Sequence, residues 1–324
     1  MATYTQLTLE QAREVGASFG VHVAQATAVP AGSVNSNYRL LLDDGTPLFA
    51  RVYEEQDQTG AEGEARLLDH LAKNGVSTPR PLARSDGRGF TASIDAENGS
   101  RAVALFPWRD GEILCQARIT PGVAEKVGQK LAEVHRAGAT FPEPRPGRFR
   151  VADLRVRLER IARADDPELR RVAPELLVRL DRAERARNPN LAHGIIHGDL
   201  FRDNVLWQGA TPVALLDFES ACDGSWAYDL MVTVLAWCYG SDFDENLARA
   251  MFKGYSSVRR PTPSELAALS NEGRIGALRF TITRITDFEM RRGLGERVVK
   301  DYRRFFARHE RLVDLGDALA RWFE

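Results

Sequence analysis

The chain has 324 residues, of which 44% are hydrophobic and 27% are charged. This length exceeds the usual size of a single hydrophobic core, so we expect two lobes. The 44 lysines and arginines nearly balance the 45 aspartates and glutamates, for a formal net charge of −1. Such a balance gives no indication of nucleic acid as a partner.

The cysteines and the apolar stretches point to a cytoplasmic protein. Cys115, Cys222 and Cys238 are odd in number and widely spaced, which predicts neither a disulfide framework nor a zinc site. The N-terminus lacks a basic region followed by an apolar run, and the longest apolar stretch, 230–238, is too short to cross a bilayer. We therefore expect no membrane partner, and the sequence leaves the oligomeric state open.

The first third of the chain predicts a small antiparallel sheet with a helix. An amphipathic helix covers residues 62–73 and is stopped by Asn74-Gly75. Helical spacing also covers residues 9–19. Strand patterns cover 21–23, 36–42, 48–53 and 101–106, with Asp43-Asp44-Gly45 as a hairpin turn.

From residue 107 on, the pattern is mainly helical. Short apolar runs at 195–196, 205–207 and 213–216 predict buried strands, with a tight turn at 208–210. Helices are predicted over 123–137, 151–164, 174–187, 227–239, 245–255 and most of 264–323. The order predicts an α+β protein with a small sheet-containing lobe over 1–106 and a larger helical lobe over 107–324.

Three acceptor side chains follow these short strands at fixed intervals. Asn204 comes five residues after Asp199, and Asp217 comes thirteen residues after Asn204. A phosphoryl-transfer enzyme of the protein-kinase type needs such a trio, because one carboxylate faces the attacking hydroxyl while an amide and a second carboxylate hold magnesium. The alternative, that Asp199 and Asn204 merely cap turns, does not account for Asp217.

These residues resemble the aminoglycoside phosphotransferase and choline kinase superfamily, which has a protein-kinase-like fold. The superfamily motifs are His197-Gly198-Asp199 with Asn204, and Asp217-Phe218-Glu219. Further pieces are similar to the homoserine kinases of this fold: 36–38, 199–204, 217–222, 228–230, 236–238 and 277–280, with Arg284 and Asp287. The resemblance implies a nucleotide-binding N-terminal lobe and a C-terminal lobe with the catalytic loop, metal site and substrate pocket. It also implies ATP and Mg²⁺ as cofactors and a small-molecule hydroxyl substrate.

The resemblance assigns a role to each motif residue. Asp199 would orient the substrate hydroxyl and take its proton, and Asn204 and Asp217 would ligate magnesium. We expect His197 to pack beneath the loop as structural support. Asp229 matches an acid that accepts backbone amides of the catalytic loop, and the alternative is an ordinary acid at a helix N-terminus.

The nucleotide half of the site follows the superfamily pattern less closely. The loop 31–37 offers Gly32, Ser33 and Asn35 to phosphate, with a plain hairpin loop as the alternative. Arg51 stands where kinases usually carry a phosphate-binding lysine, and arginine keeps the charge with a different geometry. Glu64 would be its helix partner, with Glu62 in competition or either one as simple surface charge. Phe106 and Trp108 would flank the hinge, whose backbone groups would address adenine.

A homoserine pocket needs a cation for the carboxylate and an acid or carbonyl for the ammonium. Arg202, Arg279 and Arg284 could serve the carboxylate, with structural pairing on helices as the alternative for Arg279 and Arg284. Asp223, Asp287 or backbone carbonyls could serve the ammonium. The mixed charges of the last third of the chain argue against a polycationic substrate.

Three functions remain after the sequence has been considered. The first is an ATP-dependent homoserine kinase, or a close relative that acts on another small amino alcohol or hydroxy amino acid. The second is a phosphotransferase for an aminoglycoside, a choline-like amine or a sugar. The third is a nucleotide-binding pseudokinase, favoured only by Arg51.

Overall fold

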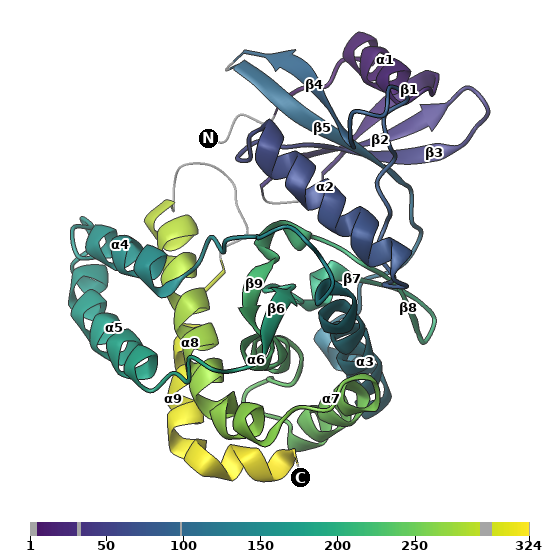
Figure 1. Cartoon of the computed structure of the whole chain (residues 1–324). Coiled ribbons are helices and arrows are strands. Elements are labelled where there is room, and N and C mark those ends of the chain that lie inside the picture. Colours follow the sequence, from purple (N-terminus) through teal and green to yellow (C-terminus); the bar gives the residue numbers. More distant parts are fainter. Residues whose placement is uncertain (1–4, 31–33, 98, 292–299, 324) are drawn as a thin grey trace. The chain divides into compact units, whose positions relative to one another are not determined.

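The computed structural model describes residues 5–30, 34–97, 99–291 and 300–323, and the chain divides into two compact units (Figure 1). The first unit comprises residues 1–112 and 213–219, and the second comprises 113–212 and 220–324. The assignment of nucleotide binding to residues 1–106, and of the catalytic loop, metal site and substrate pocket to 107–324, stays a prediction.

The first unit is built on a five-stranded antiparallel sheet in the order β1-β2-β3-β5-β4. The strands are β1 (Val23–Val29), β2 (Ser36–Leu42), β3 (Pro47–Val52), β4 (Thr91–Ala96) and β5 (Gly99–Pro107). Its core takes alternate residues of neighbouring strands, because period-two side chains share one face: Leu40, Ala50, Val52, Val103 and Leu105 are all fully buried. The predicted hairpin turn joins β2 to β3, with Gly45 at a φ of 83°.

Two helices accompany this sheet, α1 (Leu9–Ser18) and α2 (Gln58–Lys73). α2 begins four residues before the predicted start, because the side chain of Asp57 accepts the N–H of Gly60 and caps the helix. It ends as predicted at Asn74-Gly75, where Gly75 has a φ of 86°. This position of α2 brings Glu64 to the buried face of the helix.

The second unit is mainly helical, with the long helix α8 in contact with α4, α5, α6 and α9 (Figure 1). Its helices are α3 (Pro121–Gly138), α4 (Val151–Ile161), α5 (Pro167–Arg185), α6 (Trp226–Trp237), α7 (Glu245–Val258), α8 (Pro263–Asp287) and α9 (Arg303–Leu315). An antiparallel sheet in one unit and helices in the other confirm the predicted α+β class. Within the described residues, no helix is long and apolar enough to cross a membrane.

α5 is the largest departure from the predicted helices. We predict its start at Pro174, because proline favours the first turn of a helix. The structure starts it at Pro167, after the N-cap Asp166, and keeps Pro174 inside the helix. A strong N-cap followed by proline at the first position therefore overrides the interior proline, which costs the helix a backbone hydrogen bond.

α3 and α7 cross with their backbones in direct contact. A Cβ on Gly128 of α3 would lie 1.9 Å from the carbonyl oxygen of Met251, and one on Gly254 of α7 would lie 1.8 Å from that of Glu125. No side chain fits at either glycine, so the two helices can approach this closely only with glycine at both positions. This crossing fixes the buried groups that α3 and α7 carry toward the loop described below.

Four short strands surround the sequence motifs. They are β6 (His193–Ile196), β7 (Val205–Gln208), β8 (Thr211–Leu215) and β9 (Cys222–Ser225), and β6 pairs antiparallel with β9. The three that precede Asp217 match the predicted apolar runs. Short 3₁₀ helices include Arg202–Asn204 and Phe218–Ser220, and both contain motif residues.

Candidate active site

The predicted catalytic loop follows β6 in the second unit. Ile196 lies opposite Cys222 in the β6–β9 pair, which fixes the point where the loop begins. Gly198 has a φ of 73°, and a Cβ there would lie 2.9 Å from the carbonyl oxygen of Ser220. Both the left-handed backbone and the close approach require glycine, so the turn that presents Asp199 depends on Gly198.

A buried carboxylate, Asp229 in the first turn of α6, anchors the backbone of this loop. Its two oxygens accept the N–H groups of His197 and Gly198, each at 2.7 Å. Burial alone would raise the pKa of Asp229, but hydrogen bonding to His135 and the His197 N–H lowers it, so the group is ionised. Charge-assisted bonds of this kind are about twice as strong as neutral ones. The contacts are those that the bracing role requires and that a plain helix-terminal acid would not make.

A chain of buried polar groups continues from Asp229 to three other helices. The other side of the carboxylate faces His135 Nε2 of α3 at 2.9 Å, and His135 Nδ1 lies 2.7 Å from the hydroxyl of Tyr255 on α7. Burial lowers the pKa of His135 and keeps the ring neutral. The tautomer that satisfies these groups donates from Nε2 to Asp229 and accepts at Nδ1. Arg259 then donates to Tyr255 at 2.9 Å and binds Glu265 of α8 at 2.7 Å.

Sequence reasoning missed His135, Tyr255 and their partners. His135 and Asp229 are 94 residues apart, and Tyr255 is 120 residues from His135. Their helices show an apolar periodicity, but this periodicity does not say which polar residues on the buried faces will meet. The sequence did contain one indication, a histidine and a tyrosine on the apolar faces of two predicted helices.

Asp199 and Asn204 are linked through the backbone of the loop. The side-chain amide of Asn204 donates to the carbonyl of Asp199 at 2.8 Å, which leaves its oxygen for another group. The side chain of Asp199 is 31% exposed, whereas His197 is fully buried and accepts the N–H of Asp199 at Nδ1 over 3.3 Å. The loop thus holds an accessible carboxylate over a buried histidine, and an amide oxygen is a ligand that magnesium prefers.

Arg279 lies beneath the loop rather than on its open side. It is 4% exposed and donates to the carbonyl of Gly198 at 2.6 Å and to the hydroxyl of Ser220 at 3.2 Å. Its guanidinium carbon also lies 4.2 Å from the centre of the Phe149 ring. These contacts favour the structural alternative for Arg279, which supports the loop 3.8 Å from the carboxylate of Asp199.

The other two predicted substrate arginines are more accessible. Arg202, in the 3₁₀ helix after Asp199, donates to the side-chain oxygen of Gln116. Arg284 of α8 donates to the carbonyl of Asp301 at 3.1 Å. The two acids predicted for the ammonium are engaged: Asp223 accepts the N–H of Arg145 at 2.8 Å, and Asp287 pairs with Arg157 at 2.5 Å.

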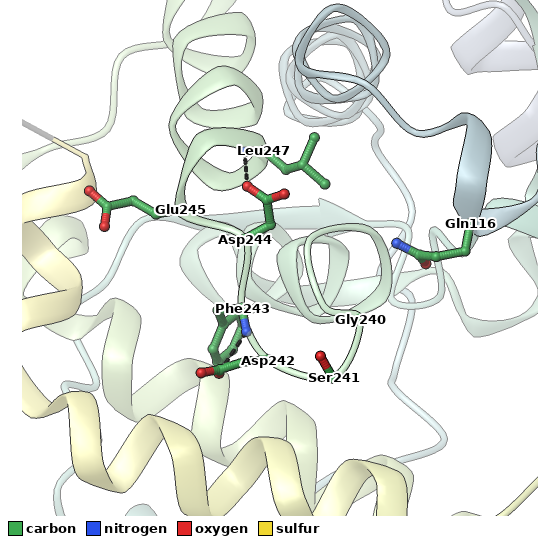
Figure 2. Close-up of a pocket in the computed structure, with 8 residues that line it drawn as sticks. All are labelled: Gln116, Gly240, Ser241, Asp242, Phe243, Asp244, Glu245 and Leu247. Atoms are coloured by element: carbon green, nitrogen blue, oxygen red, sulfur yellow. Dashed lines mark hydrogen bonds between the residues drawn. The ribbon is translucent and has the colours of Figure 1, made fainter.

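A polar pocket of about 450 Å³ opens in the second unit around the start of α7 (Figure 2). Asp244 turns toward Leu247 and accepts its N–H at 3.1 Å as the N-cap of α7. Gln116, which receives the hydrogen bond from Arg202, stands on the opposite wall from Asp244. The remaining lining residues are Gly240, Ser241, Asp242, Phe243, Glu245 and Leu247.

In the first unit, Arg51 of β3 pairs with Glu64 of α2. Their closest atoms are 3.1 Å apart, and Glu64 also accepts from Gln56 at 2.9 Å. Burial would lower the pKa of Arg51, but attraction to Glu64 and Asp217 outweighs it and raises that pKa. The competing Glu62 instead accepts the N–H of Phe90 at 3.0 Å. The structure therefore pairs position 51 with Glu64.

Asp217 and Glu219 form an acidic pair beside Arg51. Asp217 has a left-handed φ of 62°, is 41% exposed at its side chain and lies 4.0 Å from Arg51. Such backbone costs of order 1 kcal/mol for a residue other than glycine and is concentrated at functional sites. Burial, and then the charge of Asp217, raise the pKa of Glu219 to about 7. A magnesium ion on these hard oxygen donors would relieve their repulsion, so the donor set fits the metal.

The remaining predicted nucleotide residues are spread along the first unit. Asn35 donates to Glu219 and accepts the N–H of Glu54 at 3.2 Å, so its side chain is engaged with protein groups. Phe106 is buried near the end of β5, and Trp108 donates from its ring to Asp110 at 2.9 Å. Gly32 and Ser33 lie outside the described residues.

Comparisons with known proteins place the chain among phosphotransferases. The chain is 35% identical over 264 residues to a homoserine kinase of Mesorhizobium japonicum, covering 80% of each chain. Its fold is similar to that of amicoumacin kinase hAmiN in complex with AMP-PNP and Ca²⁺ (TM-score 0.73, 15% identity, 95% of this chain and 92% of that one). It is also similar to the choline kinase of Cryptosporidium parvum (TM-score 0.65, 15% identity, 91% of each).

A family model for phosphotransferase enzymes matches residues 25–269, which include the catalytic loop, Asp229 and the acidic pair. The fold is thus of the protein-kinase-like kind that the motifs predict, and the reaction class is the transfer of a phosphoryl group to a hydroxyl. The chain belongs to the phosphotransferase enzyme family (APH).

Proposed function

We propose that this phosphotransferase carries the terminal phosphoryl group of magnesium–ATP to the side-chain hydroxyl of L-homoserine. The observation that carries the reaction is the accessible carboxylate of Asp199 on a loop whose backbone is held by the ionised Asp229. The 35% identity to a homoserine kinase over most of both chains supports the acceptor. Fold similarity to choline kinase supports the fold alone.

In this proposal, Asp199 accepts a hydrogen bond from the acceptor hydroxyl and directs its oxygen at the terminal phosphorus. As the new P–O bond forms and the bond to the leaving ADP oxygen breaks, the hydroxyl proton passes to Asp199. A firmly held loop matters because misplacement of the base by about 1 Å can cost a hundredfold in rate.

Magnesium and the nucleotide would be held by residues of the sequence motifs. Asn204 and Asp217 would supply oxygen ligands, and bound magnesium neutralises charge on the transferred phosphoryl group. Arg51, held by Glu64, would donate to a phosphate oxygen. Its planar fork replaces the point charge of the usual lysine. Hinge backbone near Phe106 and Trp108 would address adenine.

The test is a coupled ADP-release assay with magnesium–ATP and four conditions: L-homoserine, choline, an aminoglycoside and no acceptor. We expect stimulation by homoserine, and a loss of at least about a thousandfold in kcat for Asp199→Asn. Asp166→Asn is the matched control, because asparagine caps a helix as well as aspartate does. Stimulation by choline or the aminoglycoside alone would discard homoserine, and near-normal turnover of Asp199→Asn would discard Asp199 as the base.

A further inference from the structure

Arg308 of α9 is a buried cation that has no carboxylate partner among residues 5–30, 34–97, 99–291 and 300–323. It is 6% exposed, and its Nε finds no hydrogen-bond partner. Among the described residues, its guanidinium contacts two aromatic rings, with its central carbon 4.2 Å from the centre of Phe305 and 4.7 Å from that of Tyr239. Burial of an unpaired charge costs several kcal/mol, so a protein that keeps one there gains something other than stability.

A second guanidinium lies on the same ring. The central carbon of Arg284 lies 4.4 Å from the centre of Phe305, so Arg284 and Arg308 both contact one phenylalanine. Burial, and then the positive charges of Arg284 and Arg304, lower the pKa of Arg308 to about 9. Burial and then Arg304 lower the pKa of Arg284 to about 10. The two cations are thus held close to each other against their mutual repulsion.

Arg202 and Arg304 complete the set, which we call the arginine cluster (Arg202, Arg284, Arg304 and Arg308). Arg304 is exposed on α9, one turn before Arg308, and Arg202 also acts on Arg308. The acids that act on Arg284 are Asp199, Asp203 and Asp301. Among the described groups with the largest effect on the pKa of Arg308, Tyr239 is the one that favours the charged form, and it is not a carboxylate. The arrangement therefore calls for an anion at Arg308.

The cluster adjoins the reacting groups of the second unit. Arg202 is three residues after Asp199, and Phe201 between them packs on Phe305 with ring centres 5.9 Å apart. The pocket of Figure 2 lies next to it. Arg202 binds Gln116 on its wall, and Tyr239, which contacts Arg308, packs edge-on against Phe243 on its wall at 4.9 Å. An acceptor presented to Asp199 would thus have arginines within reach.

We propose that the arginine cluster binds the carboxylate of an amino-acid acceptor and that Arg308 is its buried determinant. This inference rests on the proposed function and deepens it, because it selects acceptors that carry a carboxylate beside the hydroxyl. Arg284, Arg304 and Arg308 lie beyond residue 269, where the match to the general phosphotransferase family ends. Choline and aminoglycosides have no carboxylate, and the arginine cluster would repel their positive charges.

The test compares L-homoserine with 3-aminopropan-1-ol, which is the same molecule without its carboxylate. For Arg308→Met we expect kcat/KM for homoserine to fall about 10- to 100-fold, the effect of one lost charge-assisted hydrogen bond. For 3-aminopropan-1-ol it should not fall, because that acceptor has no carboxylate for the arginine to bind and the variant no longer repels its ammonium through residue 308. Arg308→Lys should lose less with homoserine, since it keeps the charge.

Stability provides a second readout and shows that the variant is folded. Methionine has a similar length and carries no charge, so Arg308→Met should unfold at the same or a higher urea concentration than the wild type. The control is Arg303→Met on the same helix, whose guanidinium pairs with the exposed Glu168. Arg303→Met should leave kcat/KM unchanged for both acceptors.

Failure of the inference differs from failure of the homoserine proposal. Equal losses with both acceptors would show a structural or phosphate-binding role and overturn the inference, as would no loss with either. A wild type that prefers 3-aminopropan-1-ol would overturn it too. Turnover of L-serine but not homoserine, with the same pattern against ethanolamine, would discard homoserine and keep the cluster as a carboxylate site.

Discussion

Replacement of Asp229 by asparagine tests whether an ionised carboxylate holds the catalytic loop. The present oxygens serve three buried donors: the N–H groups of His197 and Gly198, and Nε2 of His135. A carboxamide has one acceptor oxygen, so at least one donor would face its NH₂ group. A buried donor without a partner costs about 1–3 kcal/mol, and the other bonds lose their charge assistance, about 1 kcal/mol each. We therefore expect a loss of about 3–5 kcal/mol in the free energy of unfolding.

The assay is urea unfolding followed by tryptophan fluorescence, combined with kcat. Trp226 is a suitable probe because its ring stacks on His135, with centres 5.8 Å apart. We expect kcat to fall at least about tenfold, because the base loses its positioning. Asp166→Asn again serves as the control and should lie within about 0.5 kcal/mol of the wild type. An Asp229→Asn protein with unchanged kcat and a loss below about 1 kcal/mol would refute the bracing role.

Three further predictions concern the two halves of the site. Arg51→Ala should raise the KM for ATP about tenfold or more, and Arg51→Lys should raise it less because the charge remains; equal ATP kinetics in all three proteins would show that position 51 does not meet phosphate. Because burial lowers the pKa of His135, the unfolded chain binds the extra proton below about pH 6.5. The contribution of His135 to stability should therefore fall from pH 7.5 to 5.5, by up to about 1.4 kcal/mol per pH unit. Glu219 acts in the opposite direction, because its raised pKa lets the folded chain bind the extra proton. Asp229, whose pKa is lowered, loses its contribution only below about pH 4. Urea titrations should show the free energy of unfolding of His135→Gln rising relative to that of the wild type as the pH falls from 7.5 to 5.5. A constant difference between the two proteins would exclude a contribution from His135. Gly198→Ala should lower kcat about a hundredfold with ATP binding intact, because a Cβ meets the Ser220 carbonyl; wild-type turnover would show that the loop adapts.

The fold was predictable where local chemistry is strong. The β2–β3 hairpin, the end of α2 at Asn74-Gly75 and the short strands before Asp217 follow from turn residues and apolar runs. β4 was missed because its sequence, Thr91–Ala96, contains alanine, serine and aspartate, which have low strand propensity. It is a strand through its pairing with β5, a tertiary effect that no local pattern states.

The candidate site divides along the same line. Asp199, Asn204 and Asp217 lie close together in the sequence, so their spacing alone indicated a kinase-type site. The buried hydrogen bonds of His135 and the arginine cluster both join residues from different parts of the chain. Most of the segments that carry these residues show only an ordinary helical pattern in the sequence. A buried charge is the signal that marks Arg308, and it is visible only once the packing is known.

The glycine crossing of α3 and α7 has a consequence for how the protein is made. Gly128 leaves the ribosome 126 residues before Gly254, its counterpart at the crossing. At synthesis rates of about 5–20 residues per second, the glycine face of α3 waits roughly 6–25 s for the helix that covers it. During that time the face of α3 that α7 covers in the folded protein lacks its partner. We therefore expect chaperones and growth temperature to affect the yield of folded protein more than they affect the stability of the folded protein itself.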